Sequence, residues 1–222
     1  MTERIDPESL HDFDWKHNKG DDTFFENSPR YPFLANLVTA LKPTCLFDLG
    51  CGSGFLAQLI KHQVPEIKMH GADISRVAVG RAQAHFDQVW HLDIDHQKLP
   101  VADNFYDTVT CVEVLEHLYD PLHALIEISR ILRPGGLAVV TVPNLAYWRY
   151  RIQLFRGEIP HPAADKRHLH QFNRQMFQQI LSQAKFRLHR IVGFRERFLG
   201  LARWKPEISS EILIAVVEKD SI

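Results

Sequence analysis

Two acids and a histidine are the residues best suited to chemistry in this chain of 222 residues. Glu113, Glu116 and His117 follow the segment 105–112, which is predicted to be a buried strand. If a helix begins where that strand ends, spacings of three and four residues place the three side chains on one helix face. Two carboxylates and an imidazole on one face could bind a divalent cation or take a proton from a hydroxyl group.

Two further histidines lie in the segment 166–172, Lys-Arg-His-Leu-His-Gln-Phe, just before the last long predicted helix. His168 or His170 could act as a general base, a metal ligand or a substrate contact. The chain has 13 histidines, so some of them are there by coincidence. The sequence leaves open which of the two takes part.

A glycine-rich segment at 48–54, Asp-Leu-Gly-Cys-Gly-Ser-Gly, lies between an apolar stretch and a segment with one apolar face. This pattern predicts a strand, a glycine turn and the start of a helix. The glycines allow positive φ and let a ligand approach the main chain closely. A dinucleotide-binding motif would need glycine at position 55, which is Phe, and the Lys-Ser/Thr pair of a P-loop is missing. Both of those phosphate sites are therefore excluded.

Two aspartates indicate what the glycine turn binds instead. Asp48 places a negative charge at the mouth of the predicted helix, which disfavours a phosphate and favours an ammonium or sulfonium group. Asp73 ends the next apolar run and lies 19 residues after Gly54. Acids at about that distance usually bind ribose hydroxyls.

These ordered features resemble the class I S-adenosylmethionine-dependent methyltransferases, from about residue 31 to the C-terminus. The resemblance implies S-adenosyl-L-methionine as the cofactor. It implies that the glycine segment and the end of the fourth strand contact the methionyl part, and that two acids with their neighbours contact ribose and adenine. The implied cofactor-binding residues are Asp48, Gly50, Cys51, Gly52, Gly54, Asp73, Ile74, Asp93, Ile94 and Val112.

The stretch 111–117 is similar to two groups within this class. One is the ubiquinone-biosynthesis O-methyltransferases, whose matching acids and histidine are linked to Mg²⁺. The other is the small-RNA 3′-terminal 2′-O-methyltransferases, which add a later histidine. The resemblance implies catalytic roles for Glu113, Glu116, His117, His168 and His170. It also implies a magnesium site at Glu113, Glu116 and His117, with general acid-base action as the alternative.

The function predicted from these features is O-methylation of a small hydroxylated molecule. One alternative is metal-assisted 2′-O-methylation of an RNA terminus. Another is a cofactor-binding partner protein in a biosynthetic pathway. Segment 143–154 departs from the quinone enzymes and is more similar to the methionine-biosynthesis protein W family, whose members act with an acyltransferase. A protein partner or a homodimer therefore stays open.

Positive charge is concentrated late in the chain. Residues 149–205 contain 13 Lys and Arg against three acids, although the net charge of the whole chain is −1. This basic region could attract an anionic substrate or RNA, whose phosphates are mostly contacted by Lys and Arg. Solvated helix faces explain the same charges equally well.

The alternating pattern of strands and helices predicts an α/β fold. The family resemblance implies a Rossmann-like, seven-stranded, mostly parallel sheet with helices on both faces and an antiparallel last strand. A helix is expected over 115–132, a break at 133–136 and strands at 137–142, 186–192 and 212–217. We expect an N-terminal cap at 1–30 and a methyltransferase domain at 31–222, with an insertion at 144–174 that sets substrate specificity.

Composition predicts a cytoplasmic protein with no membrane span. No segment approaches the roughly 20 apolar residues that a spanning helix needs, and the first ten residues are too polar for a signal peptide. Cys45, Cys51 and Cys111 lack metal-site spacing, and each is expected on or beside a central strand. We interpret all three as structural.

Overall fold

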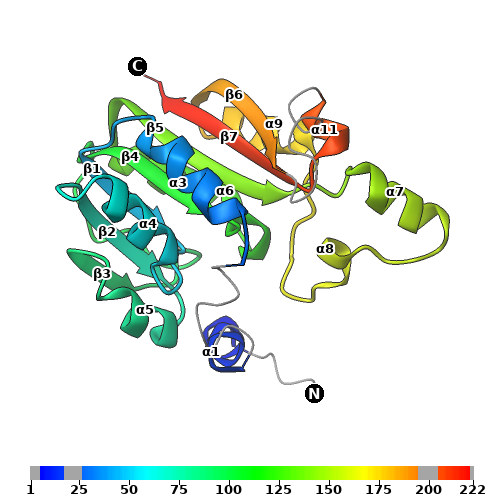
Figure 1. The fold of residues 1–222 in the computed structure, drawn as a ribbon, viewed down its shortest axis with the longest axis horizontal. Coiled ribbons are helices and arrows are strands. Elements are labelled where there is room, and N and C mark those ends of the chain that lie inside the picture. The colour runs from blue at the N-terminus through cyan, green and yellow to red at the C-terminus, as the bar shows by residue number, and fades with distance from the viewer. Residues whose placement is uncertain (1–5, 18–26, 195–204, 221–222) are drawn as a thin grey trace. The chain divides into compact units, whose positions relative to one another are not determined.

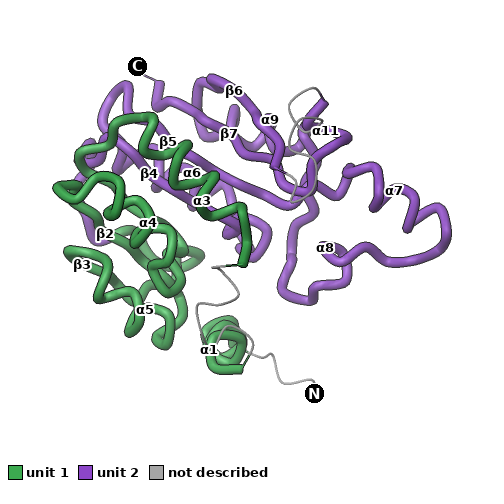
Figure 2. The backbone as a smooth tube through the Cα atoms, in the orientation of Figure 1, with its two compact units in different colours: residues 1–99 green, residues 100–222 purple. Residues whose placement is uncertain are grey.

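The computed structural model describes residues 6–17, 27–194 and 205–220, which belong to two compact units, 1–99 and 100–222 (Figure 2). The aromatic residues Phe24 and Phe25 of the expected N-terminal cap lie outside the described residues. The boundaries predicted for that cap, for the domain after it and for the insertion stay predictions.

The first unit contains three parallel strands that are paired in sequence order with regular register. Four described helices accompany them (Figure 1). The strands are β1 (Cys45–Leu49), β2 (Lys68–Asp73) and β3 (Gln88–His91), and the helices are α1 (Pro7–His17), α3 (Arg30–Thr39), α4 (Phe55–Gln63) and α5 (Arg76–Ala82).

Local sequence sets the helix starts that matter for the site. Gly54 precedes α4 with φ of 85°, in the left-handed region that glycine adopts without a steric penalty. Ser75 precedes α5, and its side chain accepts a hydrogen bond from the Ala78 N–H. Ser75 thus acts as an N-cap, which gives a hydrogen-bond acceptor to an N–H group that has no partner within the helix. α4 begins at the end of the glycine turn that follows β1, and α5 begins shortly after the end of β2.

The second unit carries four strands and the remaining described helices. Strand β4 is buried along nearly its whole length, as expected for a central strand. The elements are β4 (Tyr106–Val112), the 3₁₀ helix η1 (Leu115–His117), α6 (Pro121–Ile131), β5 (Leu132–Pro143), α7 (Trp148–Phe155), α8 (His161–Ala164), α9 (Arg174–Gln183), β6 (Phe186–Phe194), α11 (Pro206–Ser209) and β7 (Ile212–Lys219).

The strands of the described residues form one seven-stranded sheet in the order β3-β2-β1-β4-β5-β7-β6. β4 and β5 are parallel, whereas β7 runs antiparallel to both of its neighbours, β5 and β6. The predicted fold class is therefore confirmed, including the antiparallel last strand. Among the helices that the described residues form, none is long and apolar enough to cross a membrane.

The prediction of one long helix over 115–132 is wrong. Only one 3₁₀ turn forms at first, and the chain is extended at Leu118. Asp120 then caps α6 by accepting a hydrogen bond from the His123 N–H, and Pro121 occupies the first turn. Proline is favoured there because its missing N–H would be unsatisfied in any case. The break separates the acidic segment after β4 from α6.

The predicted break at 133–136 appears as an irregularity inside a longer strand. β5 already begins at Leu132, and its pairing with β4 shifts register between Tyr106 and Thr108. Gly135 has φ of 74°, which allows the backbone to turn within this stretch.

The end of α6 is held by a partly buried guanidinium. Arg130 binds both carboxylate oxygens of Glu127 at 2.9 and 2.8 Å and donates to the Val101 carbonyl oxygen at 2.9 Å. Its hydrogen bonds with Glu127, opposed by burial, raise the pKa of Arg130. Glu127 is only 3% exposed, so its charge depends on this pairing.

We therefore expect Arg130→Met to lower the free energy of unfolding by about 3 kcal/mol, because a buried carboxylate loses its cation. Arg133→Met is the matched control, since Arg133 is 59% exposed and lies 4.0 Å from Asp107. It should change stability by about 0.5 kcal/mol or less. Urea unfolding of both variants measures the difference, and equal effects would show that the Arg130 network is not stabilising.

Candidate active site

The glycine turn after β1 has the backbone that its sequence predicts. Gly50, Gly52 and Gly54 have φ of 72°, 55° and 85°, all in the left-handed region. The N–H groups of Gly50 and Cys51 both donate to the Ala72 carbonyl oxygen of β2, at 2.8 and 3.1 Å. The turn is thus fixed to the neighbouring strand through its backbone.

Two of these glycines also leave no room for a side chain. A Cβ at Gly54 would lie 3.2 Å from ring atoms of His85 and Phe86. A Cβ at Gly52 would lie 2.8 Å from Cζ2 of Trp15, closer than real Cβ atoms come to other atoms. Steric fit and positive φ therefore both require glycine at these positions.

Asp73 is held by the backbone on both sides. Its Oδ2 accepts a hydrogen bond from the Gly52 N–H at 2.9 Å, and its Oδ1 accepts one from the Ser75 N–H at 2.8 Å. A carboxylate offers about four lone-pair sites, so two acceptor sites stay available after these bonds. That is the capacity needed to bind two neighbouring hydroxyl groups, and Asp73 therefore fits the ribose of the predicted cofactor.

Asp48 and the thiol of Cys51 belong to the glycine-rich segment 48–54 and lie in buried surroundings. Asp48 is buried in β1. Burial raises the pKa of Cys51 well above its ordinary value, and the charges of Asp73 and Asp48 raise it further. The three cysteines form no disulfide bonds with one another. A buried, protonated thiol at position 51 agrees with a structural role.

Asp93 organises its own turn. Its carboxylate accepts a hydrogen bond from the Asp95 N–H at 3.0 Å and contacts Nδ1 of His96 at 2.7 Å. This hydrogen bond raises the pKa of His96. Ile94 is buried, while the Ile74 carbonyl oxygen contacts Nε2 of His91 at 2.9 Å. The predicted adenine contacts of this region stay predictions.

In the second unit, Glu113 does not share a helix face with Glu116 and His117, and that expectation is wrong. Glu113 follows Val112 at the end of β4 with φ of 54°, outside any helix. Its N–H donates to Oγ1 of Thr141 at 3.0 Å, and the Thr141 hydroxyl donates to Oε1 of Glu113 at 2.9 Å. Thr141, a buried residue of β5, was missed because its pairing with β4 is not visible in the sequence.

Glu116, His117 and His168 come together instead. One potential ligand atom of each side chain lies within 4.8 Å of those of the other two. The two imidazole rings pack edge to face, with centroids 4.8 Å apart. Glu116 is 1% exposed, whereas the two histidines are partly buried. Among the residues that the structure describes, this is the group whose side chains could hold a metal ion.

Backbone hydrogen bonds join the two sequence segments of this cluster. The N–H groups of Leu169 and His170 donate to the Glu116 carbonyl oxygen at 2.7 and 3.1 Å. Nδ1 of His117 lies 3.1 Å from the Arg167 carbonyl oxygen, and Nδ1 of His168 lies 2.8 Å from that of Pro162. A carbonyl oxygen accepts only, so each Nδ1 carries the proton and each Nε2 is an acceptor.

His170 lies outside the cluster. Its Nε2 lies 3.4 Å from the Tyr119 carbonyl oxygen, on the segment that follows η1. The loop before it is held by Asp165, whose carboxylate binds Arg167 at 2.7 and 3.0 Å. These hydrogen bonds from Arg167 lower the pKa of Asp165. The contacts by which Asp165 and the Pro162 carbonyl hold this loop and His168 depend on how the loop folds. No pattern in the sequence could have predicted them.

Comparison with known proteins places the chain in a family. Residues 26–191 match the family described as a methyltransferase domain. The chain belongs to the class I S-adenosylmethionine-dependent methyltransferases. It is 30% identical over 124 residues to a ubiquinone biosynthesis O-methyltransferase from Alkalilimnicola ehrlichii, covering 53% of this chain and 49% of that protein. Over 97 residues it is 36% identical to a malonyl-[acyl-carrier protein] O-methyltransferase from Hahella chejuensis, covering 42% and 34%.

The chain thus spans about half or less of the length of these curated relatives. Among solved structures, it is similar to an S-adenosylmethionine-dependent methyltransferase from Thermotoga maritima described as a possible histamine N-methyltransferase. The TM-score is 0.69 and the identity 19%, with 95% of this chain and 100% of that chain covered. At this identity the likeness supports the fold alone.

Asp73→Asn tests the cofactor role of the backbone-held carboxylate. The substitution removes the charge and one of the acceptor oxygens, so we expect the dissociation constant for S-adenosylhomocysteine to rise about 10- to 100-fold. Isothermal titration calorimetry measures it. Asp87→Asn is the control, since Asp87 also accepts a backbone N–H, that of Met69 at 2.7 Å, but does not contact the glycine turn. Equal affinities of the Asp73 variant and wild type would contradict the assignment.

Proposed function

We propose that this protein methylates a hydroxyl group of a small molecule and that the pair His117 and His168 accepts the hydroxyl proton. The observation that carries this proposal is the orientation of the two rings. Both Nδ1 atoms face backbone carbonyl oxygens, so both Nε2 atoms are proton acceptors. A methyl acceptor becomes a better nucleophile when such a base, placed within hydrogen-bond reach, takes its proton.

Glu116 supports this chemistry electrostatically. Its Oε1 lies 3.9 Å from Nε2 of His117, and its side chain is almost fully buried. An anion in a poorly hydrated site stabilises a nearby imidazolium more strongly than it would in water. In its ionised form, Glu116 therefore favours proton transfer to His117. Glu113 has a different role, because its carboxylate is engaged by the Thr141 hydroxyl.

When bound, S-adenosylmethionine supplies the methyl group on its sulfonium sulfur. The residues of the first unit would hold it: Asp73 would accept hydrogen bonds from the ribose hydroxyls, and the glycine turn offers a backbone that a ligand can approach closely. Orientation of the two reactants contributes more to such a displacement than covalent catalysis by the protein, up to about 7 to 11 kcal/mol.

An O-methyltransferase assignment is supported by the relatives, because both of the curated relatives named above are O-methyltransferases by name. Their acceptors differ, one belonging to ubiquinone biosynthesis and the other being a malonyl group on a carrier protein. We therefore propose the accepting atom, oxygen, and a small hydroxylated acceptor. RNA methylation is the alternative that the basic region 149–205 favours.

The donor set of the cluster does not fit Mg²⁺ well. Mg²⁺ prefers oxygen ligands, whereas this group offers two imidazole nitrogens and one carboxylate. Such a set suits Mn²⁺, Fe²⁺ or Zn²⁺ better. Glu116, His117 and His168 would hold such an ion, which would lower the pKa of a bound hydroxyl group. Metal assistance at this cluster is our second candidate for hydroxyl activation.

His117→Gln and His168→Gln test the proton-acceptor role. Each variant should lower kcat about 100-fold or more while the affinity for S-adenosylhomocysteine stays unchanged, since general-base catalysis contributes roughly 10²- to 10⁴-fold. His161→Gln, an exposed histidine at the start of α8, is the control. Methyl transfer to dihydroxybenzenes with adjacent hydroxyls and to a short RNA should be followed by mass spectrometry. Equal kcat in all three variants would remove the histidines from the mechanism.

Divalent metal dependence separates the two modes of hydroxyl activation. If the cluster binds a metal, MnCl₂ should bind wild type in calorimetry, His168→Gln should weaken that binding at least tenfold, and MgCl₂ should bind more weakly. Activity after dialysis against EDTA then decides between the modes: full activity supports the histidine base, and activity restored by Mn²⁺ supports the metal. Turnover of RNA alone, falling steeply with added salt, would contradict the small-molecule acceptor.

A further inference from the structure

Helix α1 packs on the first unit directly beside the glycine turn. Trp15 is 5% exposed and packs against Ala78 of α5, with Tyr31, Phe55 and Val77 around it. Its indole edge is so close to Gly52 that a Cβ there would lie 2.8 Å from Cζ2 and 3.0 Å from Cη2. A tryptophan from α1 thus touches the residue whose N–H holds Asp73.

Polar contacts fasten the same helix to the start of α5. Oδ1 of Asp12 accepts a hydrogen bond from the Ser75 hydroxyl at 2.6 Å and one from the Val77 N–H at 3.3 Å. Burial opposes ionisation of Asp12, but these hydrogen bonds outweigh it, and the net result is a lowered pKa. Glu8 binds Nε of Arg76 at 2.6 Å. Figure 1 shows α1 as the dark blue helix and α5 in green.

These contacts converge on the two residues that position Asp73. Gly52 and Ser75 donate their N–H groups to the two oxygens of the Asp73 carboxylate. Trp15 contacts the first of them, and Asp12 binds the side chain of the second. Both donors are therefore supported from one helix. Loss of α1 would remove the contact of Trp15 with Gly52 and the hydrogen bond of Asp12 with Ser75.

We propose that α1 is part of the cofactor site, with Trp15 and Asp12 as positioning residues that hold Gly52 and Ser75 in the geometry in which Asp73 binds the ribose. The inference rests on the proposed cofactor role of Asp73. It adds that affinity for the cofactor depends on α1, a helix that lies outside the glycine turn and the end of β2 from which the site was predicted. Preorganisation of a binding group raises affinity because the cost of ordering is met before the ligand arrives.

The contacts predict which variants weaken binding and which do not. Asp12→Ala should raise the dissociation constant for S-adenosylhomocysteine about tenfold, whereas Asp12→Asn keeps an acceptor oxygen and should stay within about threefold of wild type. Trp15→Ala should raise it at least as much as Asp12→Ala. Phe13→Ala is the control on the same helix, because Phe13 is 56% exposed, and it should change nothing.

Calorimetry with S-adenosylhomocysteine measures these constants, and stopped-flow dissociation measures the residence time of the ligand. Thermal unfolding of each ligand-free variant identifies losses of stability. Because Trp15→Ala removes a buried ring, Trp15→Phe provides a second variant in case the first does not fold. The expected signature is faster dissociation for Trp15→Phe and Asp12→Ala, with recovery in Asp12→Asn.

Four outcomes are decisive. Weaker binding in the order given supports the role of α1. Unchanged binding in folded Trp15 and Asp12 variants overturns it and leaves α1 as a packing element, and tighter binding in Trp15→Ala overturns it in favour of an indole that obstructs the site. If wild type itself does not bind S-adenosylhomocysteine, the proposed function fails and not this inference alone.

Discussion

The carboxylate of Asp73 is the group on which the first unit depends. It ends β2, and its two oxygens accept N–H groups from the glycine turn after β1 and from the residue before α5. One side chain therefore fixes the relative positions of two turns that belong to neighbouring strands. Because a charged acceptor makes stronger hydrogen bonds than a neutral one, this arrangement orders the turns before any ligand binds.

The sequence predicted the glycine turn and the place of Asp73 at the end of β2 because their determinants are local. Three glycines at alternate positions and an acid at the end of the next strand need only the order of strand, turn and helix to be recognised. The arrangement of Glu113, Glu116 and His117 in the second unit could not be predicted in the same way. Glu113 was expected on a helix, but its positive φ and its hydrogen bonds with Thr141 depend on the pairing of β4 with β5. Neither is encoded in the spacing of the acids.

The choice between His168 and His170 is also made by tertiary structure. The two residues lie two positions apart, so the sequence offered both for the same role. In the structure the N–H groups of Leu169 and His170 donate to the Glu116 carbonyl oxygen, whereas the N–H of His168 donates to that of Asp165. The two histidine rings also contact different groups. His168 packs on His117 and is fixed by the Pro162 carbonyl, whereas His170 faces the Tyr119 carbonyl. Only the folded loop distinguishes them.

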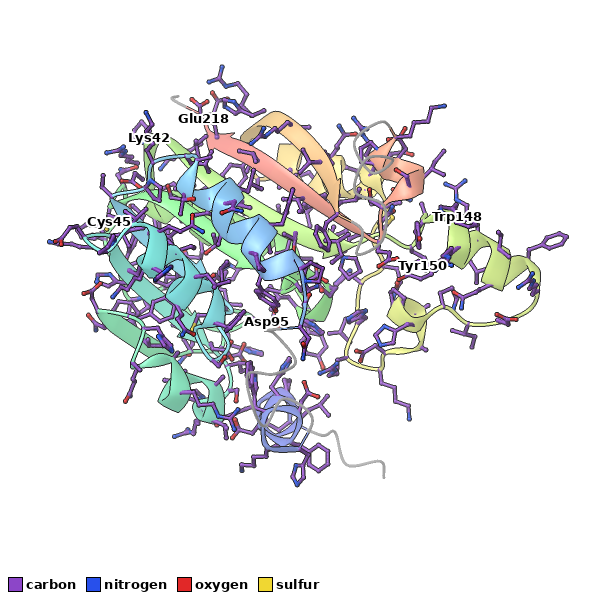
Figure 3. All side chains as sticks on the ribbon, in the orientation of Figure 1. Lys42, Cys45, Asp95, Trp148, Tyr150 and Glu218 are labelled. Atoms are coloured by element: carbon purple, nitrogen blue, oxygen red, sulfur yellow. The ribbon has the colours of Figure 1, made fainter. Side chains whose placement is uncertain are left out.

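Backbone groups orient side chains in both units. The first unit uses N–H donors for this, and the second uses carbonyl acceptors. N–H donors orient the carboxylate of Asp73, while carbonyl acceptors fix the protons of His117 and His168 on Nδ1. In the second unit, the aromatic side chains of Trp148 and Tyr150 on α7 (Figure 3) both pack edge to face on Tyr147. Substitution of surface side chains can leave the orientation of His117 and His168 unchanged, because backbone carbonyl groups hold both rings.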